Sequence, residues 1–432
     1  MQSQKTSYFV HGSRVSAVES FAPQTFHTRY ESIFVLIMFF IACAVWQVAY
    51  LPQIIGTPIY SVVVYSGYAI FVLIFLMRGR NNLSKLLRVD SVFKVLAFGV
   101  VWQLGILLLT FFTVGELPEL FTIIQMCSAG MLYVIGASLR YFDLEKFLFF
   151  LVAIVLAEAL YTCVFSGAAS FDVEVMEQSG YLVSGKNQLG GAWALVASLL
   201  IAVLVAKDKL KNYKMVLTGM LVLCLLFARC RTAFLAVVVS AFLLFVVKYS
   251  KKYFWLWILG TGFFGGLIIW AFKTGFSGTE FVTTAFLAGR EGDDLDELSS
   301  GRVTLMADAI EGIKEHPIWG LIGEHALPFG THNFFLRVWA QNGLLGGLGI
   351  LLAYVANCFS ILGDLKKSRL KGVAVDALGY FAIIVPFFIS LGEPTYPYGP
   401  STCTGLAFLF WGYSRQRERE NEITVQQNYF CQ

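Results

Sequence analysis

The sequence predicts an all-α protein: a polytopic membrane helical bundle of about twelve transmembrane helices with one long extracytoplasmic loop. Composition is the first reason, because 57% of the 432 residues are hydrophobic and only 14% are charged, whereas a soluble domain carries roughly 25% charge. The second reason is the recurrence of apolar runs of about 18 or more residues, which are long enough to cross a bilayer. The third is the uneven division of Lys and Arg between the segments that join these runs.

Twelve apolar segments are expected to span the membrane. They lie at residues 32–51, 58–77, 92–114, 120–139, 147–166, 189–206, 215–229, 232–247, 254–272, 339–362, 374–392 and 400–413. The seventh, eighth and twelfth segments are short for a bilayer core of about 30 Å, so their ends are the least defined. About thirty polar residues precede the first segment, which is therefore expected to act as an uncleaved anchor.

The distribution of positive charge predicts the orientation. With the N-terminus inside, the inner segments hold 23 Lys and Arg and the outer segments hold eight, as expected if cationic residues prefer the cytoplasmic side. Both termini are then cytoplasmic. The chain divides into an N-terminal tail, a bundle of about nine helices, a large outer loop, the C-terminal transmembrane helices and a C-terminal tail, at residues 1–31, 32–272, 273–338, 339–413 and 414–432.

The outer loop at residues 273–338 is longer than any inner connection, and loops of this length are usually functional or disordered. Its first half is acidic and rich in glycine. Its second half has helical spacing, with apolar residues at Val303, Met306, Ile310 and Ile313. This spacing predicts an amphipathic helix that ends before Pro317 and lies on the membrane surface. Trp319 follows in a turn, where it would either join the interfacial aromatic belt or stack on a sugar.

His332 and Asn333 lie at the start of the tenth span, on the outer side. A neutral imidazole there could take a proton from a hydroxyl group near neutral pH, and Asn333 could orient it or bind a hydroxyl. Gly343, Gly346, Gly347 and Gly349 would let another helix approach closely. The alternative is a helix-capping His/Asn pair followed by a packing helix, which the spacing alone favours.

Five further polar residues lie where outer segments meet helices. Arg229 and Arg231 sit between apolar runs, and the planar guanidinium group matches phosphate oxygens; the alternative is interfacial snorkelling. Lys186 and Asn187 open the sixth span and could hold a phosphate or sugar hydroxyls, or could simply be polar loop residues. Arg302 begins the loop helix, where its charge opposes the helix dipole, so an anionic partner would explain it; a solvated face is the alternative.

No metal or cofactor site is predicted. The acidic residues between Asp293 and Glu297 lack the alternation and glycine of a calcium loop, so a solvated loop tip is expected. The eight cysteines show no ligand spacing, and most lie inside apolar runs, which predicts neither a disulfide nor a metal site. No phosphate-cradling glycine motif is present, so neither ATP use nor nucleotide-sugar binding is expected, and no nucleic-acid partner is expected.

These residues resemble the O-antigen ligase and O-antigen polymerase superfamily of bacterial envelope glycosyltransferases. The ligase signature H-[NSQ]-x9-G-x-x-[GTY] is matched by His332, Asn333, Gly343 and Gly346. A second family element, R-x3-L, is similar to the segment 231–235, and the SGR…HPIWG stretch is similar to the family's large outer loop. The resemblance covers about residues 185–360.

The resemblance implies a GT-C-like, multi-pass enzyme of the bacterial cytoplasmic (inner) membrane. It implies metal-independent, cofactor-free, inverting transfer of a glycan from undecaprenyl diphosphate, with the outer loop as catalytic loop. Arg231 would hold the diphosphate with Arg229 and Arg302, and His332 would be the base. Membrane lipid surrounds the helices, and a chain-length regulator and a flippase of the same pathway are implied as candidate partners.

Two alternatives stay open at this stage. The acceptor is either another lipid-linked repeat unit, as in a polymerase of O-antigen, capsule or exopolysaccharide, or lipid A–core, as in a ligase; the abundance of polymerases in surface-polysaccharide pathways favours the first. A lipid-linked oligosaccharide transporter would also suit twelve spans. A transporter should carry ionisable or broken helices at mid-membrane, whereas here the polar residues gather on one outer loop.

Overall fold

The computed structural model describes residues 70, 72–79, 86–115, 121–139, 144–165, 186–206, 212–227, 230–249, 302–320, 331–371, 377–393, 397–398 and 401–430. The predicted spans 32–51 and 254–272, most of the span 58–77 and the first half of the outer loop lie outside these residues. Within the described part the secondary structure is entirely helical, so the all-α prediction is confirmed there.

Most predicted spans in the described part correspond to helices. These are α5 (Ser91–Val114), α6 (Phe121–Ser138), α7 (Leu144–Phe165), α9 (Lys186–Ala206), α10 (Asn212–Phe227), the helix Arg231–Tyr249, α15 (Phe334–Lys371) and α18 (Thr402–Phe430). A short π-helix, η1 (Phe75–Gly79), precedes them, and α14 (Arg302–Glu315) is the predicted loop helix. The span expected at 374–392 is instead two short helices, α16 (Leu378–Ala382) and α17 (Ile384–Ile389).

Three helices are long and apolar enough to cross a membrane by length and composition, at Ser91–Thr113, Arg231–Tyr249 and Phe334–Ser368. Apolar side chains on the outside of α5, such as Val101, Leu108 and Phe112, are largely exposed, as expected of a surface that faces lipid. These features support an integral membrane protein. They do not confirm the count of twelve spans, because several described apolar helices are shorter than 18 residues.

Two predicted boundaries differ from the structure for local reasons. The helix expected at 374–392 is interrupted at Ile383, and Pro386 follows in α17, where it has no N–H to continue the helical ladder. The helix expected to end at residue 413 instead continues as α18 to Phe430. Its charged continuation is held by ion pairs to neighbouring helices, which hydrophobicity alone does not reveal.

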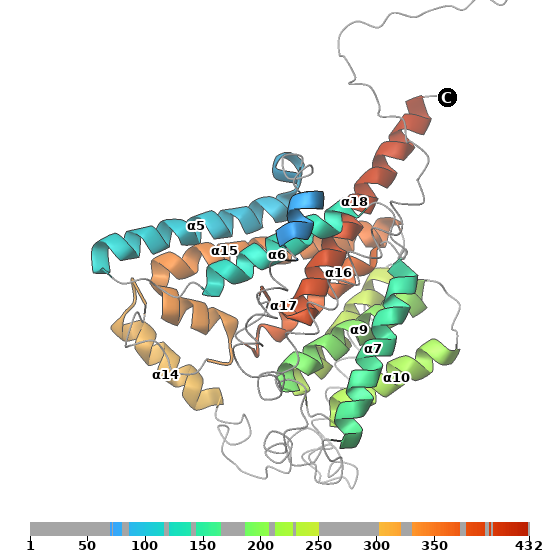
Figure 1. Cartoon of the computed structure of the whole chain (residues 1–432), viewed down its shortest axis with the longest axis horizontal. Helices are drawn as coiled ribbons and strands as arrows, with labels where there is room; N and C mark the ends of the chain where they lie inside the picture. The colour runs from blue at the N-terminus through green and yellow to red at the C-terminus, as the bar shows by residue number, and fades with distance from the viewer. Residues whose placement is uncertain are drawn as a thin grey trace, which may run out of the picture.

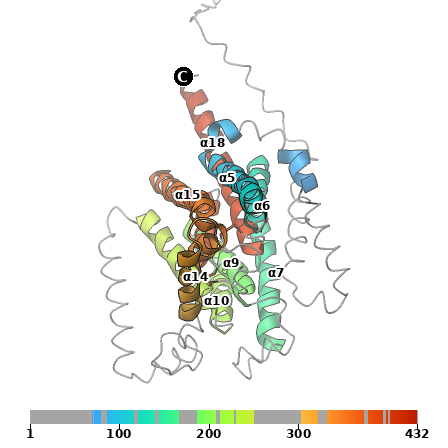
Figure 2. The same cartoon turned by 90° about the vertical axis from the view of Figure 1, so that its left-hand side faces the viewer.

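Figure 1 shows α5, α6, α15 and α18 packed beside one another, with α7, α9 and α10 forming a second group. Glycine allows the closest contacts, because a Cβ at Gly136 or Gly412 would overlap backbone atoms of the facing helix. Helix α14 lies at the end of the molecule opposite the C-terminus in both views (Figures 1 and 2). The bundle therefore has two distinct ends, which are described in turn.

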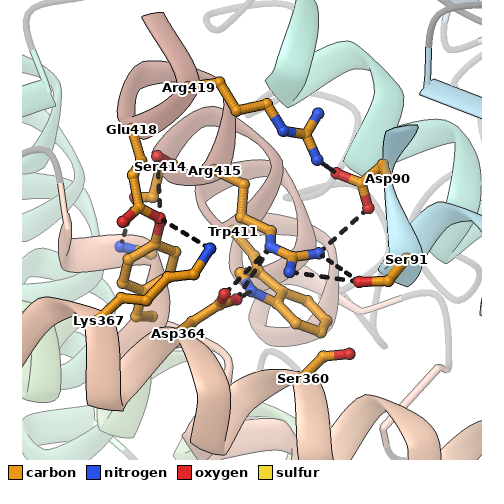
Figure 3. A network of polar contacts seen from close by, with 12 residues as sticks. Asp90, Ser91, Ser360, Asp364, Lys367, Trp411, Ser414, Arg415, Glu418 and Arg419 are labelled. Atoms are coloured by element: carbon orange, nitrogen blue, oxygen red, sulfur yellow. Dashed lines mark hydrogen bonds and ion pairs between the residues drawn. The ribbon is translucent and has the colours of Figure 1, made fainter. Parts of the chain in front are cut away.

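Buried charges close the end of the bundle that the sequence predicts to be cytoplasmic (Figure 3). Asp90 is fully buried and caps α5 by accepting the N–H of Phe93 at 3.0 Å. It also accepts the hydroxyl of Tyr133 at 2.7 Å and a hydrogen bond from Arg415 at 3.2 Å, and it pairs with Arg419. Burial alone would raise the pKa of the Asp90 carboxyl, but the two guanidinium groups and the hydrogen bonds from Tyr133 and Phe93 together hold that pKa below its usual value.

Arg415 joins three helices at this end. Its Nε lies 3.1 Å from a carboxylate oxygen of Asp364 on α15, and the same carboxylate accepts the indole N–H of Trp411 at 2.8 Å. Each buried carboxylate is thus matched by a guanidinium group and further hydrogen bonds, the condition under which buried charge is tolerated. The network fixes the ends of α5, α15 and α18 relative to one another.

Candidate functional site

His332 and Asn333 directly precede α15, at the end of this helix opposite the buried charge network. The side-chain oxygen of Asn333 accepts the backbone N–H groups of Phe335 at 2.9 Å and Leu336 at 3.2 Å, as an N-cap does. Its amide nitrogen donates to the carbonyl of Leu391 at 3.1 Å. The capping alternative therefore describes how Asn333 is held, and binding of a substrate hydroxyl by this residue stays a prediction.

Helix α17 and the turn that follows it are tied to α15 by hydrogen bonds. The N–H of Phe334 donates to the carbonyl of Ser390 at 3.1 Å. The Tyr354 hydroxyl lies 3.0 Å from both the Ser390 hydroxyl and the carbonyl of Phe387. These contacts bring the end of the turn, Glu393, beside the start of α15.

Glu393 links the two residues that the sequence singled out on the outer loop. Its carboxylate accepts a hydrogen bond from Nη2 of Arg302 at 3.0 Å, and Nη1 of Arg302 donates to the Gly392 carbonyl at 3.1 Å. The other carboxylate oxygen lies 3.7 Å from Nδ1 of His332, just beyond hydrogen-bond distance. The Glu393 side chain is only 8% exposed, whereas those of Arg302 and His332 are 27% and 32% exposed. The carboxylate is thus sheltered beneath two side chains that reach solvent.

This arrangement suits a histidine that acts as a base. Nδ1 of His332 is buried and has no hydrogen-bond partner in the described part of the chain. A small approach of the Glu393 carboxylate, 3.7 Å away, would let an N–H on Nδ1 bond to it and would leave Nε2 as the proton acceptor. The same carboxylate is the anionic partner that the sequence led us to expect for Arg302, since a cation at the start of α14 opposes the helix dipole.

Arg231 reaches the same end of the bundle by a different route. It is the first residue of the helix Arg231–Tyr249, and its neighbours on both sides contact other elements. A Cβ at Gly190 of α9 would lie 2.7 Å from the Cys230 side chain, and one at Gly392 would lie 3.0 Å from Thr232. Gly392 precedes Glu393, whose carboxylate lies between the side chains of Arg302 and His332. The structure therefore brings Arg231 to the end of the bundle that holds His332 and not to the opposite end.

Four helices begin in this region: α9, the helix Arg231–Tyr249, α14 and α15. Each helix start carries a partial positive charge, so their convergence favours an anion. Lys186 and Asn187 are the first two residues of α9, but their side chains, like the whole of Arg229, lie outside the described residues. Their predicted roles stay predictions.

Trp319 lies away from His332, in the turn at residues 316–320 that follows α14. It is half-buried there, and this turn packs against α15 at Gly343, a full three turns from His332. The glycines after Gly343 admit α5, since a Cβ at Gly349 would overlap the ring of Trp102. Close helix approach at this glycine-rich stretch is therefore confirmed, and stacking of Trp319 on a sugar stays a prediction.

Sequence reasoning missed Glu393. The available signal was an acidic residue, followed by proline, directly after an apolar run on the predicted outer side. It could not be paired with Arg302 or His332, because 91 residues separate it from the first of these. Among the described residues no group of three or more His, Cys, Asp or Glu is placed to hold a metal ion.

The fold and this site define a class: a multi-pass helical membrane protein with cationic groups, a histidine and a carboxylate gathered at one end of the bundle. Residues 215–351 match the family model described as O-antigen ligase. The resemblance predicted from the sequence is thereby confirmed over a range that contains Arg231, Arg302, His332 and Gly343. No curated protein matches the chain.

Proposed function

We propose that this protein is a glycosyltransferase that moves a glycan from a polyprenyl diphosphate carrier to a sugar hydroxyl on the outer face of the cytoplasmic membrane. The observation that carries the proposal is the meeting of Arg302, Glu393 and His332 beside the start of the helix Arg231–Tyr249. The match to the O-antigen ligase family supports it independently.

Arg231 and Arg302 are the proposed ligands of the diphosphate. Negative charge grows on this leaving group as the bond between the anomeric carbon and the diphosphate oxygen breaks, so fixed cations stabilise the transition state more than the ground state. The converging helix starts add partial positive charge of the same sign. Arg302 already holds a carboxylate in a geometry that a phosphate oxygen can also adopt.

His332 is the proposed general base. Its Nε2 takes the proton of the acceptor hydroxyl while that oxygen attacks the anomeric carbon, and the polyprenyl diphosphate leaves with the bonding electron pair. A single displacement of this kind inverts the anomeric centre. Glu393 orients the imidazole and stabilises the imidazolium that forms, so no metal ion is required for either role.

The proposed orientation places this site outside the cytoplasm, with both termini inside, as the excess of Lys and Arg on the opposite side suggests. Exposed apolar side chains on α15, such as Trp339 and Leu344, follow His332 along the chain, and a polyprenyl chain would be accommodated between this surface and the bilayer. The lipid tail of the donor explains why an enzyme that handles glycans is mostly embedded in the membrane.

Of the two acceptors, we propose another lipid-linked repeat unit, which makes the protein a polymerase. The test supplies the purified protein with an undecaprenyl-diphosphate-linked repeat unit, with and without lipid A–core. A ladder of lipid-linked oligomers without lipid A–core supports polymerisation. A glycan attached only to lipid A–core would make the protein a ligase, and no product in either mixture would contradict the proposed transfer.

A further inference from the structure

Helix α15 is broken at Gly343, which has φ of 61° and ψ of −172°. The break divides α15 into a first segment, residues 334–342, and a second segment, residues 344–371. The first segment begins at Phe334, two residues after His332, so its direction sets where the imidazole lies. Whatever fixes this break therefore fixes the candidate base.

The turn at residues 316–320 inserts at the break. The N–H of Leu344 donates to the carbonyl of Pro317 at 2.8 Å, and the N–H of Leu345 donates to that of Ile318 at 3.5 Å. These two N–H groups open the second segment of α15. The turn after α14 thus supplies carbonyl groups that cap this segment from outside the helix.

Glycine is required on both sides of this crossing. A Cβ at Gly343 would overlap the carbonyl oxygen of Ile318, and one at Gly320 would overlap the backbone nitrogen of Gly343. Both glycines also have positive φ, 61° and 79°, which other residues adopt only with strain. Two backbones are therefore in direct contact at this point.

Helix α5 completes the joint from the other side. The indole N–H of Trp102 donates to the carbonyl of Leu345 at 2.9 Å, and the Gln103 amide donates to that of Gly346 at 2.7 Å. Gln103 is buried within an apolar helix, where a polar side chain is costly unless it has a specific partner. Its partner is the first turn of the second segment of α15.

Helix α14 is anchored at both of its ends, at its start to the turn after α17 and after its end to α15. At its start, Arg302 contacts Glu393 beside His332, and after its end the turn at residues 316–320 contacts Gly343. At 1.5 Å per residue the 14 residues of α14 extend about 20 Å, and residues 334–342 of α15 extend about 14 Å. Helix α14 packs against α15 and is long enough to reach both ends of this first segment, so it lies along the segment as a splint.

We infer that this splint positions the site: α14 and the turn at residues 316–320 hold the first segment of α15 so that Arg302 and His332 act on one substrate. Gly320, Gly343 and Gln103 are then positioning residues, although all three lie away from the reacting atoms. Gly343, the first glycine of the family signature, is thus the point at which α15 changes direction and contacts the turn at residues 316–320. The inference rests on the proposed function for its catalytic consequence, but its structural half stands without it.

The test compares Leu344→Pro with Leu344→Ala. Leu344 is 49% exposed, and both variants remove the same lipid-facing side chain. Only proline also removes the N–H that bonds to Pro317, at the first position of a helical segment, where proline is otherwise tolerated. Hydrogen exchange across residues 302–320 and the steady-state constants for the lipid-linked donor are measured for both purified variants. Gln103→Met, which removes the donor to Gly346, is the second variant.

We expect Leu344→Pro to speed exchange across α14 and to lower kcat by about 100-fold with little change in KM, because small displacements of a catalytic group have effects of this size. Leu344→Ala should match the native protein. Gln103→Met should show the same faster exchange and lower kcat, and it carries the test if Leu344→Pro does not fold. Native exchange or native kcat in folded Leu344→Pro, or in Gln103→Met if the proline variant does not fold, overturns the splint. If the native protein transfers no glycan at all, the proposed function fails, and the exchange comparison still decides whether the joint exists.

Discussion

Neutralising Glu393 tests the geometry of the site most sharply among the residues that the sequence did not suggest. Glu393→Gln keeps the size of the side chain and removes its charge. Charge-assisted hydrogen bonds contribute about 1.5–3 kcal/mol, and partial exposure of Arg302, at 27%, reduces this to about 1–2 kcal/mol. The variant should therefore fold and insert in the membrane.

The effect on activity follows from the position of Glu393 behind His332. A general base contributes about 10²–10⁴-fold to rate, and Glu393 cannot contribute more than this through His332. We expect Glu393→Gln to lower kcat by about 10- to 100-fold, since the carboxylate lies 3.7 Å from Nδ1 and its charge stabilises the imidazolium. Initial rates of glycan transfer by purified protein in detergent or nanodiscs measure this effect.

Glu315→Gln is the matched control. It makes the same chemical change at an exposed residue at the far end of α14, which does not contact the site. In a His332→Ala background, Glu393→Gln should lower the rate by less than it does alone, since the part of its effect that acts through His332 is already lost. Native kcat in Glu393→Gln, or a loss that multiplies fully with that of His332→Ala, would refute the reasoning.

Three further predictions concern the cations, metals and pH. Arg231→Ala should raise the donor KM or stop turnover, and Lys should rescue poorly because an ammonium group lacks the planar fork; full activity with either residue would argue against contact with the diphosphate. EDTA should leave the initial rate unchanged, and a strict requirement for a divalent cation would instead direct attention to Asp293–Glu297. Because the pKa of Asp90 is lowered in the fold, its contribution to stability is present above about pH 4 and is lost as pH falls through the lower folded value. Asp90→Asn should therefore lower Tm at pH 7, with a difference from the native protein that shrinks on acidification; a constant difference would contradict the assignment.

The helical class and most residues of the candidate site were predictable from local information. Hydrophobic run length identifies helices such as α5 and α6 to within a few residues, because each run must satisfy its backbone within the segment. Arg231 and His332 were recognisable because each is a charged or titratable residue at the predicted outer end of an apolar run, and Arg302 because it opens the predicted loop helix. Their roles still await the measurements above.

Long-range pairing could not be predicted in the same way. The contact of Glu393 with Arg302 joins distant segments, and so does the insertion of the turn at residues 316–320 into α15. The spacing of Gly343 in the signature indicated a special backbone position. It indicated neither the positive φ of this glycine nor its contact with the backbone of the turn at residues 316–320. Arg415 contributed to the predicted orientation only as a charge, whereas its buried pairing with Asp90 and Asp364 depends on three helices meeting.

The central claim is that His332 takes the proton of the acceptor hydroxyl. Its most direct test is the rate at which purified His332→Ala releases polyprenyl diphosphate from a lipid-linked glycan in the presence of acceptor, at matched amounts of folded protein. The account predicts a fall of at least about 100-fold with donor binding retained. Release at the native rate would contradict it.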